Sequence, residues 1–233
     1  MSDAPGAPLP RRYYERHAVA LARAVLGRLL VCDGPEGRVG GWIVETEAYR
    51  GARDPASHAW RGRSPRNRVM FGPPGHAYVY LIYGVHLCLN LVVEPEGRAA
   101  AVLVRALAPW HGEALMRRRR GVEAAERLAC GPGNLGRALG LTRGHDGADL
   151  TRGPIWLSDQ PPRRFGLLTA SGPRVGIRRG LERQWRFYLE GHPCVSGPRG
   201  RGGRMTDIAC RQIPVDTPAG RSYYPPSVHR APR

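Results

Sequence analysis

The longest apolar run of the chain, residues 77–93, predicts a β-hairpin. Aromatic and β-branched residues dominate the run, and they favour strands over a helix. Gly84 lies near its centre, where a turn can reverse the chain. A membrane-spanning helix needs about 20 apolar residues, whereas this shorter run includes His86 and Asn90. We therefore expect two core strands and no membrane segment.

Periodicity elsewhere predicts helices and strands in mixed order. Apolar residues at helical spacing cover residues 14–25. Asp54 followed by Pro55 is typical of the start of a second helix, which would carry His58. Further helices are expected over residues 113–119 and 122–128. Strands are expected over residues 29–32, 39–45, 100–106, 155–157, 174–177 and 185–189.

This order of elements favours an α+β fold with a largely antiparallel sheet, because strands and helices do not alternate regularly. A chain of 233 residues is expected to form a single compact domain. The expected architecture is a curved sheet flanked by helices, from which the hairpin protrudes. The Pro-rich residues 1–12 are expected to be flexible. Residues 197–233, rich in Gly, Arg and Pro, are expected to form a disordered basic tail.

The charge balance points to a polyanionic partner. The chain has 36 basic and 19 acidic residues, a formal net charge of +17, and contains no lysine. The planar guanidinium of arginine binds phosphate oxygens through two hydrogen bonds, which the ammonium group of lysine cannot do. Such an excess of positive charge predicts fast, salt-sensitive association with nucleic acid. A GC-rich coding bias would explain the use of arginine in place of lysine, but it would not explain the net charge.

Cysteine usage indicates a reducing compartment. The five cysteines form no C-x-x-C pair, and the chain contains no H-E-x-x-H motif. Neither a zinc site nor a disulfide framework is therefore expected. The N-terminal residues contain no hydrophobic signal region. We therefore expect a cytoplasmic, nucleoid-associated protein without a cofactor or metal.

The first candidate chemistry lies at the end of the strand expected over residues 39–45. Glu45, Glu47 and Tyr49 are spaced by two, so they share one face if the strand continues. Two carboxylates and a tyrosine near the basic loop 60–68 are candidates for acid–base work. Taken alone, both glutamates are better explained as ordinary charges at a strand end.

Seven short motifs, in this order, resemble the alkyladenine (3-methylpurine) DNA glycosylases, the type unrelated to the helix-hairpin-helix glycosylases. The motifs are VETEAY (44–49), DPASHA (54–59), SPRNRVMF (64–71), YVYLIYG (78–84), VRAL (104–107), CGPGNL (130–135) and RFY (186–188). Seven ordered blocks are far more specific than any single motif. The resemblance covers residues 13–196, which we expect to form the glycosylase domain.

The resemblance implies roles for five residues around a flipped base. Glu47 is similar to the general base that activates the water attacking the sugar C1′. Tyr49, His58 and Tyr80 are similar to the residues that enclose the base. Asn90 is similar to the residue that sterically rejects the exocyclic amino group of normal guanine. Both residues also have a purely structural alternative. His58 would be a helix histidine whose hydrogen bonds are satisfied within the protein, and Asn90 would be a strand residue whose amide bonds to its neighbours.

Four further residues are expected to contact DNA. Tyr83, next to the hairpin turn, has little core to pack against and is similar to the residue that fills the vacated base stack. Arg105 is similar to a contact to the backbone of the displaced nucleotide. Arg66 and Arg68 lie in the basic loop and are expected to bind DNA as well.

The implied activity is monofunctional excision of alkylated purines from double-stranded DNA by a monomeric enzyme. Candidate lesions are 3-methyladenine and 7-methylguanine, with hypoxanthine and ethenoadenine left open. A damaged base is cheaper to extrude from the duplex, and a positively charged alkylpurine is attracted to aromatic walls. Strand-nicking glycosylases commonly use an amine, and without lysine only the N-terminal amine remains. Water is therefore the expected nucleophile.

Two other classes of protein could use some of the same features. A non-catalytic nucleic-acid-binding protein would use the same basic surface and aromatic wedge, but it would gain nothing from Glu47 near phosphates. A nuclease or phosphotransferase usually needs clustered carboxylates for metal ions. Glu45 and Glu47 are too few for such a cluster.

Overall fold

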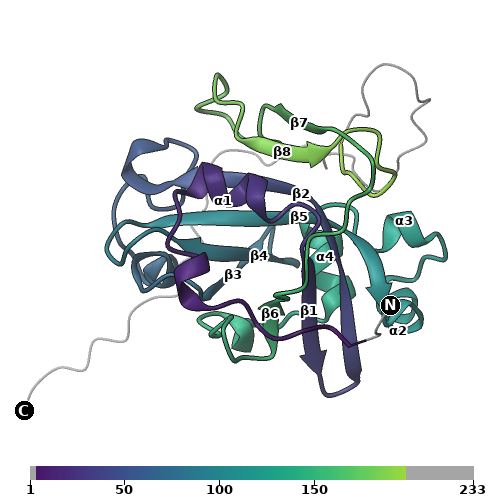
Figure 1. Ribbon diagram of the computed structural model, residues 1–233. Helices are drawn as coiled ribbons and strands as arrows, with labels where there is room; N and C mark the ends of the chain where they lie inside the picture. Colours follow the sequence, from purple (N-terminus) through teal and green to yellow (C-terminus); the bar gives the residue numbers. More distant parts are fainter. Residues whose placement is uncertain (1–3, 198–233) are drawn as a thin grey trace, which may run out of the picture. The chain divides into compact units, whose positions relative to one another are not determined.

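Eight strands and several short helices make up residues 4–197, which are the residues that the computed structural model describes (Figure 1). The strands are β1 (Leu29–Gly34), β2 (Gly37–Arg50), β3 (Ala77–Ile82), β4 (His86–Val93), β5 (Ala100–His111), β6 (Ile155–Leu157), β7 (Thr169–Gly172) and β8 (Arg186–Leu189). The α-helices are α1 (Ala18–Ala24), α2 (Glu113–Arg120), α3 (Ala125–Leu128) and α4 (Pro132–Leu139). The 3-10 helices are η1 (Arg11–Tyr13), η2 (Gly51–Arg53), η3 (Arg68–Phe71) and η4 (Arg143–His145).

The strands form one antiparallel sheet in the order β3-β4-β5-β2-β1-β6, with β8 paired to β2 and β7 paired to β8. The pairing of β2 with β5 shifts register on both sides of Glu45. Such bulges bend a strand and increase its twist. Beyond this bend β2 leaves β1 and pairs with β8 instead. The expected α+β fold with a curved antiparallel sheet is confirmed.

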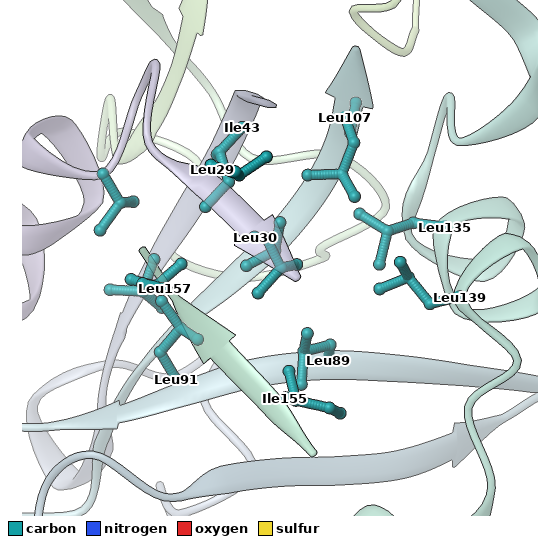
Figure 2. Packing of buried hydrophobic residues seen from close by; sticks show 14 of the residues in the cluster. Leu29, Leu30, Ile43, Leu89, Leu91, Leu107, Leu135, Leu139, Ile155 and Leu157 are labelled. Atoms are coloured by element: carbon teal, nitrogen blue, oxygen red, sulfur yellow. The ribbon is translucent and has the colours of Figure 1, made fainter. Parts of the chain in front are cut away.

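One face of the sheet carries the main apolar core. Helices α1 and α4 contribute Leu21, Ala22, Leu135 and Leu139 to it, and all four side chains are buried. Figure 2 shows leucines of β1, β4, β5 and α4 gathered there with Ile155 and Leu157 of β6. Alternate residues of the central strands therefore point to the opposite face.

The opposite face carries a smaller cluster with polar neighbours. Its buried members are Ala59, Met70, Tyr78, Val92, Ala99 and Ala101. Tyr80 packs against this cluster and is partly buried. Because aromatic and polar side chains share this face, this face is the candidate location of the active site.

The hairpin strands expected over residues 77–93 are present as β3 and β4. Their pairing is antiparallel, from Ala77 opposite Leu91 to Ile82 opposite His86. Gly84 has a φ of 73° and Tyr83 has a φ of 52°, so the turn uses the left-handed region at both residues. No helix within residues 4–197 has the length and apolar character needed to cross a bilayer.

Two expected elements are wrong, for one shared reason. The segment that follows Asp54 forms turns instead of a helix, and the strand expected over residues 174–177 is replaced by β7, which ends before them. The carboxylate of Asp54 accepts from the backbone N–H of Ala56, as a helix cap would, but both of its oxygens are also buried against the guanidinium of Arg174. This long-range ion pair overrides the local signals at both positions.

The N-terminal expectations also need correction. The first long helix is shorter than expected, because α1 begins at Ala18 after the separate turn of η1. The flexibility expected for residues 1–12 does not describe residues 8–12. Leu9 is buried, its N–H donates to the carbonyl of Leu157, and Arg11 pairs with Asp149. Apart from Gly197, the expected tail over 197–233 lies outside the described residues.

The contact between α4 and β4 gives a prediction for Gly136. A Cβ at this position would lie 2.0 Å from the backbone oxygen of Leu87. Alanine gains about 1 kcal/mol of helix propensity over glycine, but forcing the backbones apart costs about 1–3 kcal/mol or more. We expect Gly136→Ala to lower the melting temperature by several degrees, measured by thermal unfolding.

Gly34→Ala is the matched control for this prediction. A Cβ at Gly34 would meet no heavy atom closer than 3.8 Å, and its φ lies outside the left-handed region. Equal melting temperatures for the two variants would contradict the proposed close approach of α4 to β4.

Candidate active site

Four adjacent strands align a row of residues across the polar face of the sheet. Tyr78 lies opposite Asn90, Asn90 opposite Leu103, and Leu103 opposite Glu47. Neighbouring strands are about 4.8 Å apart, so the backbones of Glu47 and Asn90 are separated by roughly 10 Å. Alternation places Tyr80 on the same face. The sheet therefore brings together residues from two of the sequence motifs, and Asn90 from outside them.

Glu47 is held by two hydrogen bonds and one ion pair. Its side chain has no exposed area. Oε1 forms an ion pair with Arg105 Nη1 at 3.1 Å and accepts a hydrogen bond from the backbone N–H of Val175 at 2.7 Å. Oε2 accepts from the hydroxyl of Tyr49 at 2.7 Å. Oε2 retains a second lone pair, so the carboxylate is fixed in orientation and can still accept a proton.

Glu45 forms the centre of a second ion-pair group. Its Oε1 accepts from Arg105 Nε at 2.8 Å and from Arg186 Nε at 2.6 Å, and its Oε2 accepts from the backbone N–H of Ser196 at 2.8 Å. Burial opposes ionisation of this carboxyl, but Arg105 and Arg186 outweigh it and hold the pKa of Glu45 below its ordinary value. Glu45 is thus a structural anion, paired on both oxygens.

Arg105 connects the two carboxylates. Its Nε and Nη1 reach Glu45 and Glu47, and its Nη2 donates to Ser196 Oγ at 3.0 Å. The side chain is almost completely buried. The resemblance implies a contact to the DNA backbone for Arg105, which stays a prediction. In this structure its three nitrogens contact protein atoms.

His58, Tyr78 and Tyr80 form an aromatic wall. The His58 ring lies 4.4 Å from the Tyr80 ring, nearly perpendicular to it, and the Tyr78 hydroxyl lies 2.9 Å from His58 Nδ1. Two causes lower the pKa of His58 to about 4: desolvation by burial is the larger, and the positive charge of Arg66 is the smaller. The imidazole is therefore neutral at neutral pH. Tyr78 was not expected at the site, although it shares a strand face with Tyr80.

Tyr49 links the aromatic residues to the carboxylate. Its hydroxyl donates to Glu47, and the guanidinium of Arg174 lies over its ring, 4.6 Å from the ring centre. Burial, reinforced by the charge of Glu47, raises the pKa of Tyr49 well above its ordinary value. The phenol therefore stays protonated and remains a hydrogen-bond donor.

Asn90 and Tyr83 occupy contrasting positions. Asn90 is buried, and its Nδ2 donates to the carbonyl of Tyr78 at 3.2 Å. This bond uses one donor of the side-chain amide, as expected of an ordinary strand residue. Steric rejection of the guanine amino group by Asn90 stays a prediction. The side chain of Tyr83 is 82% exposed at the hairpin turn. Its placement agrees with a residue that has no core to pack against.

The basic loop lies beside the aromatic wall. Arg66 Nη2 donates to the carbonyl of Leu81 at 3.2 Å, and its guanidinium lies 5.6 Å from the centre of the Tyr80 ring. Asn67, which sequence reasoning missed, is buried and donates to the carbonyls of His58 and Gly62. Arg68 is exposed at the start of η3.

Other features of the described chain lie away from this face. Two hollows of about 400 and 470 Å³ are lined by other residues, including Arg23 and Phe187 for the first and Cys32 and Arg119 for the second. Within residues 4–197, no three His, Cys, Asp or Glu side chains gather in a way that could hold a metal ion. The candidate site is therefore defined by its buried charges and aromatic side chains.

Comparisons with known proteins agree with the sequence motifs. A family model described as methylpurine-DNA glycosylase (MPG) matches residues 12–193. Relatives named "Putative 3-methyladenine DNA glycosylase" include one from Bradyrhizobium diazoefficiens, 47% identical over 193 residues, which cover 83% of this chain and 92% of the relative. Another, from Mesorhizobium japonicum, is 49% identical over 195 residues, covering 82% and 91%. A third, from Methanocella arvoryzae, is 47% identical over 193 residues, covering 81% and 95%.

These matches identify the class first: the protein is a DNA N-glycosylase, a hydrolase of DNA repair whose partner is DNA. Within this class, the chain belongs to the methylpurine-DNA glycosylase family. Base flipping is implied by membership of this family.

The environment of His58 gives a prediction about pH. Its pKa in the folded protein is about 4, below the ordinary value of 6.5, so the unfolded chain binds more protons between these values. The contribution of His58 to stability is therefore complete above pH 6.5 and is lost as the pH falls through 4. An NMR titration of the ring, assigned with a His58→Gln variant, should give a pKa near 4.

Arg66→Gln provides the control for this titration. Loss of the guanidinium charge should raise the pKa of His58 only part of the way, because desolvation is the larger cause. A pKa at or above 6.5 in the native protein would contradict the packed aromatic wall.

Proposed function

We propose that this protein is a monofunctional glycosylase that releases alkylated purines from double-stranded DNA and leaves an abasic site with an intact backbone. The proposed substrates are 3-methyladenine and 7-methylguanine, with hypoxanthine and ethenoadenine as further candidates. The observation that carries the proposal is the Glu47 carboxylate, which two hydrogen bonds and an ion pair orient on the face that also holds the aromatic wall. We propose that the enzyme acts as a monomer in base excision repair, on nucleoid DNA in the cytoplasm.

Base flipping is the first proposed step. A purine must leave the duplex before its glycosidic bond can be reached, at a cost of a few kcal/mol. Tyr83 would fill the gap in the base stack, a role supported by its exposure at the hairpin turn. Arg66 and Arg68 would contribute contacts to phosphates from the exposed basic loop.

The displaced purine would then lie among Tyr49, His58 and Tyr80. Aromatic faces attract a base that carries positive charge after alkylation at N3 or N7. A neutral His58 adds no opposing charge to this wall. Asn90 would limit the space next to the base, so that the amino group of normal guanine does not fit.

Glu47 would accept a proton from the water that attacks the sugar C1′. As the bond between C1′ and the purine nitrogen breaks, its electron pair goes to the base, which leaves neutral if it was cationic. The water oxygen bonds to C1′, and its proton passes to Glu47. The negative carboxylate also faces the positive charge that develops on the sugar in an oxocarbenium-like transition state. Because a cationic alkylpurine is already a good leaving group, a single carboxylate acting as general base is sufficient for its release.

The direct test is release of bases from methylated DNA in EDTA. We expect free 3-methyladenine and 7-methylguanine by chromatography, and strands that break only after treatment with alkali. Tight binding of damaged DNA without release would favour the non-catalytic DNA-binding alternative. Strand breaks before alkali treatment would contradict the monofunctional mechanism.

Glu47→Gln should lower the rate of base release by at least about 10²–10⁴-fold, because the amide keeps the shape but cannot accept the proton. Binding of damaged DNA should persist. Single-turnover excision and a binding titration measure the two quantities. Glu126→Gln, at an exposed helix position, is the matched control and should match the wild type. A near wild-type rate for Glu47→Gln would assign proton acceptance to another group.

Tyr83→Ala should slow excision, most strongly for lesions that remain well paired, because the extruded state loses its aromatic filler. Tyr83→Phe keeps the ring and should restore most of the rate. The experiment compares one lesion in a stable pair and in a mismatch. Equal rates for Tyr83→Ala and wild type on both duplexes would remove the wedge role.

A further inference from the structure

A buried ion pair lies next to the strand segment that carries the proposed general base. Arg174 and Asp54 have no exposed side-chain area, and they pair through two bonds, Nη1–Oδ2 at 2.5 Å and Nη2–Oδ1 at 2.8 Å. This fork joins the loop after β7 to the segment after β2, 120 residues apart in the chain. Bidentate pairing of this kind fixes the orientation of both groups.

The same guanidinium contacts the strand segment that carries Glu47. Arg174 Nη1 also donates to the carbonyl of Ala48 at 2.9 Å, and the guanidinium lies over the ring of Tyr49. The residue that follows Arg174 is Val175, whose N–H donates to Glu47 Oε1. Two hydrogen-bond donors to Glu47, the Val175 amide and the Tyr49 hydroxyl, therefore depend on the placement of Arg174.

We infer that Arg174, clamped by Asp54, is a positioning residue for Glu47. This inference rests on the proposed function. Arg174 orients the carboxylate through the Val175 amide on one oxygen and through the Tyr49 ring on the other. A displacement of about 1 Å at a reacting group can cost roughly 10²-fold in rate, so loosening the clamp slows base release without removing any group that touches DNA.

Arg174→Lys tests the inference while it keeps the positive charge. An ammonium group lacks the planar fork, so it cannot form both bonds to Asp54 and the bond to Ala48 in the same geometry. We expect the single-turnover rate constant at saturating enzyme to fall by about 10–100-fold. The dissociation constant for damaged DNA should change by less than about twofold.

The rate constant separates positioning from a purely structural role. Partial unfolding lowers the amplitude of a single turnover, whereas a misplaced Glu47 lowers its rate constant. Arg11→Lys is the matched control, because Arg11 also joins distant segments, through Asp149 and the carbonyl of Pro74. It should retain the wild-type rate constant.

Two more variants keep the test decisive if Arg174→Lys does not fold. Asp54→Asn weakens the clamp from its other side, and combining it with Arg174→Lys should cost no more than the worse single change. Val175→Pro removes the amide donor to Glu47 and keeps the side chain of Arg174, so it should also slow excision.

The outcomes distinguish this inference from the proposed function. If the wild type releases no base from methylated DNA, the proposed function fails. If the wild type is active and Asp54→Asn and Val175→Pro retain its rate constant, the inference is overturned. Loss of DNA affinity in proportion to loss of rate would also overturn it, because Arg174 would then act on binding.

Discussion

Burial of two carboxylates within a sheet is the constraint on which the rest of the structure depends. Glu45 and Glu47 have no exposed side-chain area, and an unpaired buried charge costs several kcal/mol. Arg105 lies between them and pairs with both, and Arg186 supplies a second cation to Glu45. These partners come from β5 and β8, so the strands on both edges of β2 must keep their register.

The two faces of the central strands divide stability from chemistry. On β4, Leu89 and Leu91 point into the main core, whereas Asn90 between them points to the polar face. The apolar face holds the strands rigid against α1 and α4. That rigidity orients the side chains on the other face, as a precise site requires.

Much of the fold was readable from local pattern. The apolar run at 77–93 predicted β3 and β4, and spacing by two placed Glu45, Glu47 and Tyr49 on one face. Motif resemblance named the family, and comparison confirmed it. The helix expected after Asp54 and the strand expected at 174–177 were wrong, because the ion pair of Asp54 with Arg174 overrides the local preferences of both segments.

The sequence by itself therefore determined most of the strands along the chain, the alternation of the two faces and the family. Only the tertiary structure decided which groups hold Glu47: the amide of Val175 and the hydroxyl of Tyr49 through hydrogen bonds, and the guanidinium of Arg105 through an ion pair. Val175 lies 128 residues from Glu47 in the chain, and a backbone amide has no sequence signature. Such contacts form only in the folded protein, where buried charges need partners, and no local pattern records them.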